Sequence, residues 1–432
     1  MVISNVLFAV GNLICGLAKS EWTMILGRVV SGMGGGGLMA IATFVASDLV
    51  PLRQRGMVQA FGNICFGLGA GLGGVFGGWV NDTWGWRVAF LAQVPPVVVS
   101  GILVWFIVDI PPKKSEKSKL SRVDFLGAFT LVLTLMLLLL GLNSGGNVVP
   151  WNHPLVYVSL PLSAVALLAF IYVEARVATE PVIPVHLLMD RTVAFACLTN
   201  WFCTMVLFMG AFYVPIFFQV KGLSTTQAGA RLIPQSIGAS TGSLIAGIVM
   251  NKTGKYKLLG FVLTATLTVG VAFLSSMNFQ TPEWPPILYM FLIGTGYGGM
   301  LVVTLLAVVS AVDHEHQAVV TSATYAFRST GSTIGVTIGS AVYQNVLLSQ
   351  LHTRFDGRKG ADREIQRIRN SLDELKHLPE GWKNGVYDSY EMALRSVFLT
   401  AVGVAVLGTV CYAFIRQHTL HKTLERRASS QS

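Results

Sequence analysis

The sequence predicts an all-α polytopic membrane protein. Of its 432 residues, 53% are hydrophobic and only 12% are charged, whereas a soluble domain carries about 25% charged residues. The mean hydropathy is +0.61, and the apolar residues are gathered into long runs separated by short polar turns. The net charge of +10 does not indicate nucleic-acid binding, because the basic residues lie in the turns between apolar spans.

Twelve apolar segments are long enough to cross a bilayer, which takes about 17–25 residues in a helix. We expect helical spans at residues 1–18, 22–46, 57–79, 88–109, 125–143, 154–173, 192–219, 227–250, 258–277, 285–309, 318–347 and 393–416. All five cysteines fall inside these spans, so the sequence predicts no disulfide framework and no metal-binding spacing.

The distribution of Lys and Arg predicts which turns face the cytoplasm. Alternate turns are basic, and the remaining turns hold little beyond Lys19, Arg87 and Lys221. We therefore place the basic turns, the tail at 418–432 and Met1 on the cytoplasmic side. The basic residues are Arg53, Arg55, Lys113, Lys114, Lys117, Lys119, Arg122, Arg176, Arg191, Lys252, Lys255 and Lys257.

A sizeable loop at 349–392 is predicted on the outer or lumenal side. Apolar residues recur in it at helical spacing among charges, which predicts a short amphipathic helix. These residues are Ile365, Ile368, Leu372, Leu375 and Leu378. We interpret this helix as a lid or surface helix, with a partner contact as the alternative.

Glycine-rich motifs carry a resemblance to a known family. The run from Arg28 through Gly32, Gly34 and Gly36 resembles the fourth-helix motif of major facilitator transporters. The run Gly69-Ala-Gly-Leu-Gly73-Gly74-Val-Phe-Gly77-Gly78 resembles the fifth-helix antiporter motif. Residues 86–95, WRVAFLAQVP, follow it as they do in the fourteen-helix drug:proton antiporter branch, and the turn at 47–56, SDLVPLRQRG, is similar to fungal vacuolar basic amino acid transporters.

The resemblance implies a major facilitator fold in which the visible spans correspond to family helices 3–14. The expected organisation is an incomplete first half of four helices at 1–110, a basic loop with two linking helices at 111–191, and a six-helix second half at 192–417. Two departures stand out. Gly74 occupies the usual proline position of the antiporter motif, and the acidic residue of the family's first helix has no counterpart here.

Three charged residues are candidates for coupling or transport. Arg28 and Arg328 lie inside predicted spans, where an arginine is costly and therefore paired or functional, and Asp48 lies at a span end. Snorkelling is the alternative for Arg28, and a structural role is the alternative for Arg328. Arg231 is interpreted as structural, beside a helix break at 234–235.

Polar and aromatic residues of the second half are candidates for lining a central cavity. The alternative for each is an interfacial aromatic or an ordinary hydrogen bond between helices. The candidates are Asn200, Trp201, Tyr213, Gln219, Tyr289, Tyr297 and Tyr325.

The sequence predicts no cofactor and no catalytic site. It contains no phosphate loop of the GxxxxGK[ST] type and no nucleophile elbow, so transport is expected to use a proton gradient. The charged turn at 313–316, DHEH, is interpreted as solvated rather than as a metal site. The glycosylation sequon at Asn81 lies too close to the membrane for modification. The expected partners are a small-molecule substrate, protons and the bilayer, with the chain as a monomer that binds no nucleic acid.

The predicted function is secondary transport by alternating access, in which two halves rock about a midplane cavity. The resemblance implies a basic amino acid exchanged for protons across a vacuolar membrane. Physically, a cationic substrate favours a buried carboxylate, yet Asp48 and Glu174 lie at helix ends. The alternatives are a plasma-membrane multidrug:proton exporter and, from another class, a non-transporting fragment or membrane scaffold.

Overall fold

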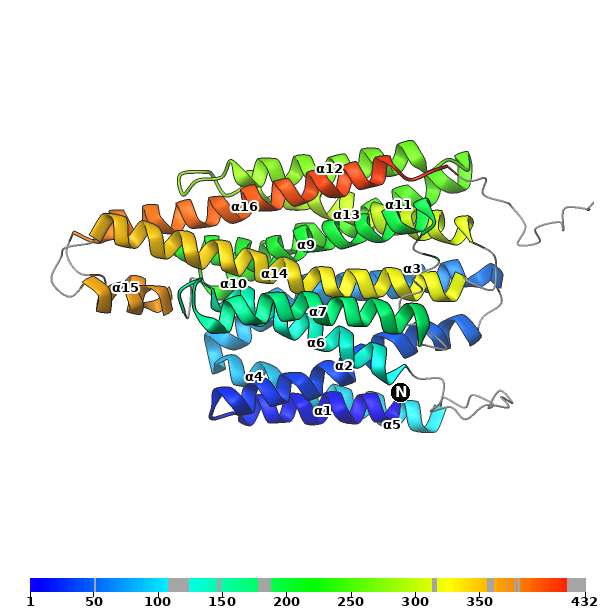
Figure 1. Ribbon diagram of the computed structural model, residues 1–432, viewed down its shortest axis with the longest axis horizontal. Helices are drawn as coiled ribbons and strands as arrows, with labels where there is room; N and C mark the ends of the chain where they lie inside the picture. Colours follow the sequence, from blue (N-terminus) through cyan, green and yellow to red (C-terminus); the bar gives the residue numbers. More distant parts are fainter. Residues whose placement is uncertain are drawn as a thin grey trace, which may run out of the picture. The chain divides into compact units, whose positions relative to one another are not determined.

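The computed structural model describes residues 1–49, 52–107, 124–145, 149–177, 187, 189–312, 317–355, 361–370, 372–376, 378 and 381–417. Helices dominate these residues (Figure 1). The α-helices are α1 (Val2–Leu17), α2 (Glu21–Leu49), α3 (Leu52–Trp84), α4 (Trp86–Leu91), α5 (Val94–Ile107), α6 (Phe125–Ser144), α7 (Pro154–Arg176), α9 (Arg191–Val220), α10 (Thr225–Ala230), α11 (Ile233–Thr253), α12 (Lys257–Ser275), α13 (Pro285–Ala311), α14 (Gln317–Phe355), α15 (Ala361–Asn370) and α16 (Lys383–Ala413).

Each of the twelve predicted spans coincides with a helix or a pair of consecutive helices, which confirms the all-α membrane fold. Among the described residues, eight spans are long and apolar enough to cross a bilayer, namely α4 with α5, α6, α7, α9, α10 with α11, α12, α13 and α16. Helices α2, α3 and α14 are also long, with 29, 33 and 39 residues. All three contain many Gly, Ser and Thr residues alongside their large apolar residues, so their faces can serve packing and polar contact as well as lipid.

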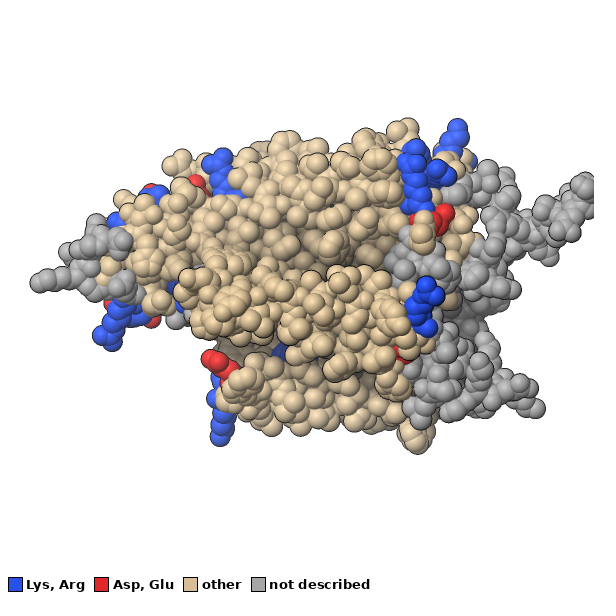
Figure 2. Space-filling view, viewed as in Figure 1, with Lys and Arg blue, Asp and Glu red and all other residues tan. Residues whose placement is uncertain are grey.

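Charged side chains are distributed as expected for membrane helices. On the face shown in Figure 2, most Lys, Arg, Asp and Glu side chains gather toward helix ends, and the flanks between them are uncharged. Lipid does not solvate charge, so uncharged flanks are the surfaces that a bilayer can cover.

The chain forms two compact units. The first consists of residues 1–116 and 223–233, and the second of residues 117–222 and 234–432. The first unit therefore contains α1 to α5 together with α10, and the second contains the helix pair α6 and α7 together with α9 and α11 to α16. The helix break predicted at 234–235 lies slightly earlier, at 231–232 between α10 and α11, which is also where the chain passes from one unit to the other.

Glycines bring helix backbones together in the first unit. A Cβ at Gly34 would lie 2.7 Å from the backbone of Phe8, so α2 crosses α1 at backbone distance. A Cβ at Gly78 would lie 2.7 Å from the Thr225 backbone, and Gly74 of α3 faces Gly229 of α10 in the same way. The other motif glycines, Gly32, Gly36, Gly69, Gly73 and Gly77, have open space where a Cβ would stand.

A second set of glycines joins α11 and α13 in the second unit. A Cβ at Gly298 would overlap the carbonyl of Ala239, and one at Gly294 would overlap that of Gln235. Gly238 and Gly242 of α11 approach the backbone of α13 equally closely. This small-xxx-small spacing on two facing helices is the arrangement by which membrane helices pack closely without a hydrophobic driving force.

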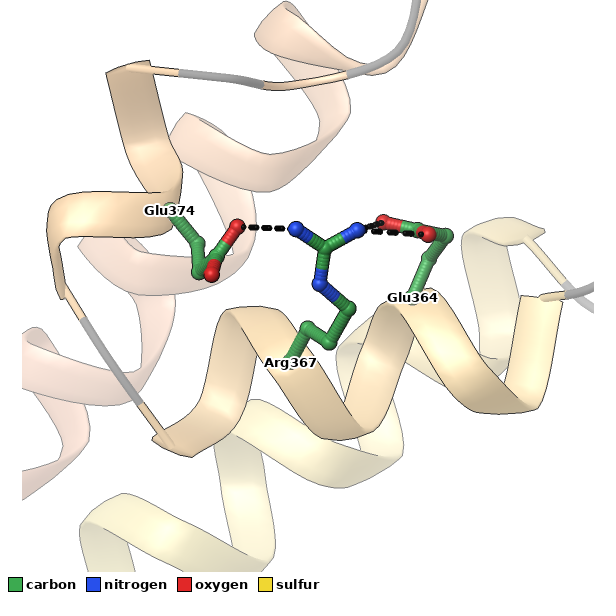
Figure 3. A network of polar contacts seen from close by, with 3 residues as sticks. All are labelled: Glu364, Arg367 and Glu374. Carbon is green, nitrogen blue, oxygen red and sulfur yellow. Dashed lines mark hydrogen bonds and ion pairs between the residues drawn. The ribbon is translucent and has the colours of Figure 1, made fainter.

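The amphipathic helix predicted in the 349–392 loop is confirmed as α15. Its Ile365 and Ile368 are buried, and the Tyr390 hydroxyl of α16 donates a 2.7 Å hydrogen bond to the Ile368 carbonyl. Arg367 links Glu364 and Glu374 at 3.1 and 2.7 Å, tying α15 to the following 3-10 helix at Leu372–Lys376 (Figure 3). The loop is shorter than predicted, because α14 continues to 355 and α16 begins at 383.

The close crossing of α11 and α13 predicts that substitution by alanine affects stability differently at two glycines. Gly298→Ala places a methyl group against the Ala239 carbonyl and should destabilise the second unit by about 1–3 kcal/mol, the usual cost of overpacking. Gly247→Ala, also in a helix but with open space around the new Cβ, should leave stability unchanged or raise it, because Ala is the better helix former. Thermal unfolding of the two purified variants measures the difference; equal melting temperatures would refute close packing at Gly298.

Candidate functional site

One face of α14 is polar although the helix lies among membrane spans. Five residues at positions i, i+3, i+4, i+7 and i+8 share this face. We call them the α14 polar face: Tyr325, Arg328, Ser329, Ser332 and Thr333. Tyr325, Ser329 and Thr333 are exposed and the other two are half-buried, whereas the opposite face of the helix is buried through Val320, Ala323 and Ile334. Exposed polar residues at membrane depth indicate a surface in contact with water rather than lipid.

Two hydroxyl groups of the α14 polar face, those of Ser332 and Thr333, are satisfied within their own helix. Ser332 donates to the Ser329 carbonyl at 2.7 Å, and Thr333 donates to the same carbonyl at 3.2 Å. These hydroxyl oxygens keep their acceptor capacity. The hydroxyls therefore need no external partner, although they can bind one.

Arg328 differs from its neighbours on this face. Its guanidinium lies over the Tyr325 ring, 4.9 Å from the centroid, which is a cation–π contact. Among the described residues, no carboxylate lies within ion-pair distance of it. A guanidinium carries a positive charge and five N–H donors, so the site offers both to a ligand.

Trp201 of α9 contacts α14 at Gly331. A Cβ at Gly331 would be 2.7 Å from the Trp201 carbonyl and 3.0 Å from its indole, so α9 and α14 cross here at backbone distance. Gly331 follows Arg328 by one helical turn. Trp201 is half-buried, and its indole lies against α14 at Gly331.

Two other predicted cavity residues lie in packed helix interfaces instead. Asn200 is 2% exposed and donates to the Thr304 hydroxyl of α13 at 2.9 Å and to the Ala196 carbonyl at 2.9 Å. The Tyr297 hydroxyl lies 3.3 Å from that of Thr204. These pairs are hydrogen bonds between α9 and α13. Sequence reasoning did not single out Thr204 or Thr304, because a threonine inside an apolar span gives no signal of which helix it faces.

Two further cavity candidates, Tyr213 and Tyr289, pack against other aromatic rings. Tyr213 is 5% exposed and its ring packs against Tyr343 of α14 at 5.6 Å between centroids. Tyr289 stacks on Phe273 at 5.4 Å. Gln219 is half-buried near the end of α9. Of the predicted residues, the structure thus brings Tyr325 and Arg328 together and places Trp201 against Gly331 of the same helix.

Arg28 occupies an exposed position in the first unit. Its guanidinium lies 5.8 Å from the centroid of the Phe90 ring of α4. Within the described part of the chain it has no carboxylate partner. Asp48 lies on α2, but its side chain is outside the described residues, as are the turn at 313–316 and the tail at 418–432.

The end of α3 is tied to the start of α10 through Asp82. The Asp82 carboxylate accepts 3.0 and 2.5 Å hydrogen bonds from the Thr226 amide and hydroxyl and another from the Thr225 hydroxyl. A carboxylate in this position satisfies amide donors that open a helix and complements its dipole. Asn81 donates to Thr225 at 3.4 Å, so the sequon asparagine takes part in this helix contact.

The turn after α11 docks on the end of α16. Gly254, with φ +65°, ends α11, and the following amides of Tyr256 and Lys257 donate to the Gln417 side chain at 3.1 and 2.9 Å. The hydroxyl of Tyr412 donates to the Tyr256 carbonyl at 2.9 Å. Backbone amides, tyrosines and the Gln417 side chain make this contact.

These features define a class of protein. Bundled membrane helices, close glycine crossings and a water-facing polar face with an uncompensated arginine are typical of multi-pass transporters. Residues 1–336 match the model of the Major Facilitator Superfamily. The chain belongs to this superfamily.

Similar proteins are found along nearly the whole chain. It is 36% identical to the multidrug resistance protein fnx1 of Schizosaccharomyces pombe, over 99% of this chain and 81% of the relative. It is 33% identical to the vacuolar membrane amino acid uptake transporter fnx2 of the same yeast, over 96% and 72%. It is 31% identical to vacuolar basic amino acid transporter 2 of Saccharomyces cerevisiae, over 94% and 89%.

The fold is also shared with a solved structure. A bacterial homolog of the human lysosomal transporter Spinster, in an inward-facing and occupied conformation, superposes with a TM-score of 0.59 at 17% identity. The match covers 95% of this chain and 81% of that structure. It supports the major facilitator fold predicted from the glycine motifs.

The Asn200–Thr304 contact predicts a purely structural phenotype. Asn200→Ala removes a buried hydrogen bond between α9 and α13, which in membrane proteins costs on the order of 0.6–2 kcal/mol. The melting temperature should therefore fall while the relative affinity for different substrates stays the same. The double variant with Thr304→Ala should destabilise less than the two single variants combined. A change in substrate preference without loss of stability would instead place Asn200 at the cavity.

Proposed function

We propose that this protein is a secondary active transporter that exchanges basic amino acids for protons across a vacuolar membrane by alternating access. The observation that carries the proposal is its similarity, over 94% or more of the chain, to two transporters named for vacuolar amino acid transport. Membership of the Major Facilitator Superfamily supports alternating access between two helical halves.

The candidate site is compatible with a polar, charged substrate. The α14 polar face offers hydroxyl acceptors and a guanidinium donor, and Trp201 lies against the same helix at Gly331. An amino acid has an ammonium group for the acceptors and a carboxylate for the donor. A hydrophobic drug would use the aromatic side chains but leave the arginine uncompensated.

A second candidate function is proton-coupled multidrug export at the plasma membrane. It is favoured by the name of fnx1, the multidrug resistance protein that is 36% identical to this chain. The two candidates differ in membrane and in substrate, so localisation and transport assays on the same tagged protein distinguish them.

The proposal predicts vacuolar uptake that depends on a proton gradient. Vacuoles isolated from cells expressing the protein should accumulate labelled Lys, Arg and His several-fold faster than vacuoles from cells lacking it. The excess should vanish when a protonophore dissipates the gradient. Uptake that is equal with and without the protein contradicts the amino acid proposal. Extrusion of cationic dyes by cells with the protein at the plasma membrane would favour the multidrug alternative.

Arg28 is proposed to take part in proton or substrate coupling, and this gives a separate prediction. Inserting an arginine at the centre of a membrane helix costs about 2.5–3.5 kcal/mol of free energy. An arginine in such a helix is therefore expected to have a function. Arg28→Ala should abolish gradient-driven uptake while leaving the amount of protein in the membrane unchanged, and Arg28→Lys should retain part of the uptake because the charge is kept.

A matched control for Arg28 is available in the same unit. Arg87 donates to the Ala18 carbonyl at 3.1 Å and lies over Trp86, so Arg87→Ala should reduce stability rather than coupling. Wild-type uptake by the Arg28→Ala variant would restore the interpretation that this side chain only snorkels to the interface.

A further inference from the structure

Among the residues that the structure describes, Arg328 has no counterion. Arg328 lies 11 residues after the first residue of α14, or about 16 Å along the axis at 1.5 Å per residue. This is roughly half the thickness of a hydrocarbon core of about 30 Å. A guanidinium at that depth must be compensated by something that it contacts.

No compensating group comes from the helices packed against this part of α14. Among the helices that contact it, α9 and α13 contain no Asp or Glu, and neither does α6. Helix α16 has Asp388 and Glu391 near its start. Asp388, however, pairs at 3.0 Å with Arg354, which is 26 residues, or about 39 Å, farther along α14.

The contact with Tyr325 orients Arg328 without neutralising it. The guanidinium carbon lies over the aromatic ring, so the cation–π contact uses the face of the guanidinium plane. Hydrogen bonds to a carboxylate are made instead by the N–H groups at its edge, in a two-pronged geometry that matches two carboxylate oxygens. Within the described residues, the edge groups have no hydrogen-bond acceptor.

We propose that Arg328 binds the carboxylate of the transported substrate, with Tyr325 holding the guanidinium and Trp201 flanking the bound group. The inference rests on the proposed function for the class of substrate, because an α-amino acid supplies the carboxylate. It also answers the difficulty that a cationic amino acid poses. The protein recognises the anionic group that all amino acids share, and a buried acidic residue is not required at this site.

The proposal predicts that the protein binds amino acids more tightly than their decarboxylated analogues. Lysine and cadaverine, or arginine and agmatine, differ only in the carboxylate. Purified protein in lipid nanodiscs should be stabilised against heat by lysine, arginine and glutarate. Affinities for cadaverine and agmatine should be weaker on the order of 10- to 100-fold, the range expected when a charge-assisted hydrogen-bonded pair is lost.

Variants connect the discrimination to the residue. Arg328→Gln should remove the preference for the carboxylate-bearing ligand. Arg328→Lys should keep part of this preference, because lysine keeps the positive charge but lacks the two-pronged N–H geometry of the guanidinium. Tyr325→Leu should weaken lysine binding more than cadaverine binding. Arg354→Gln is the matched control, an arginine whose exposed ion pair lies far along the same helix, and it should keep the full preference.

The outcomes separate this inference from the proposed function. Equal stabilisation by lysine and cadaverine overturns the carboxylate site even when vacuolar uptake is confirmed, and so does an absence of stabilisation by every carboxylate tested. Stabilisation by glutarate that depends on Arg328, with no stabilisation by lysine or arginine, supports the site and overturns the amino acid function. If an Arg328 variant fails to fold, the wild-type protein still tests the carboxylate site, because its affinities for lysine and cadaverine, or for arginine and agmatine, can be compared directly.

Discussion

The structure depends on helices that approach to backbone distance. Lipid tails are as apolar as leucine, so burial of apolar surface does not hold membrane helices together, and close van der Waals packing must do so. Gly34 against Phe8, Gly78 against Thr225 and Gly298 against Ala239 provide this packing in α1–α2, α3–α10 and α11–α13. The same glycines that would weaken a soluble helix therefore position the other side chains of both units.

Helix α14 shows how a membrane helix combines packing with polarity. Its buried face contacts α9 through Gly331 and Gly335. On its polar face, the hydroxyls of Ser332 and Thr333 donate hydrogen bonds to a backbone carbonyl of the same helix. Internal hydrogen bonding makes Ser332 and Thr333 tolerable at membrane depth, since their hydroxyls are not left unsatisfied. Arg328 carries the charge of this face, and its N–H groups have no acceptor among the described residues. Arg328 is therefore the group on this face that we expect to bind a ligand.

Sequence reasoning identified the helices well because twelve apolar runs of bilayer length have few alternative folds. It also identified Gly34, Gly74 and Gly78, whose contacts the structure shows, along with Gly32 and Gly73, which face open space. It could not separate Asn200 and Tyr297 from Trp201 and Tyr325, since all four are polar or aromatic residues in apolar spans. Which of them is buried follows from the rotation of each helix about its axis, and only its neighbours determine that rotation.

The amino-acid sequence by itself determined that this chain is a bundle of membrane helices of the major facilitator type, because hydropathy, span length and glycine motifs are local properties. The tertiary structure alone decided that Asp82 caps α10 and that α10 packs with the first unit. It also decided that Arg328 lies over the Tyr325 ring with no carboxylate in ion-pair distance within the described part of the chain. The reason is physical: partners such as Asp82 and Thr226 are 144 residues apart, and nothing in the local sequence records a contact made across that distance.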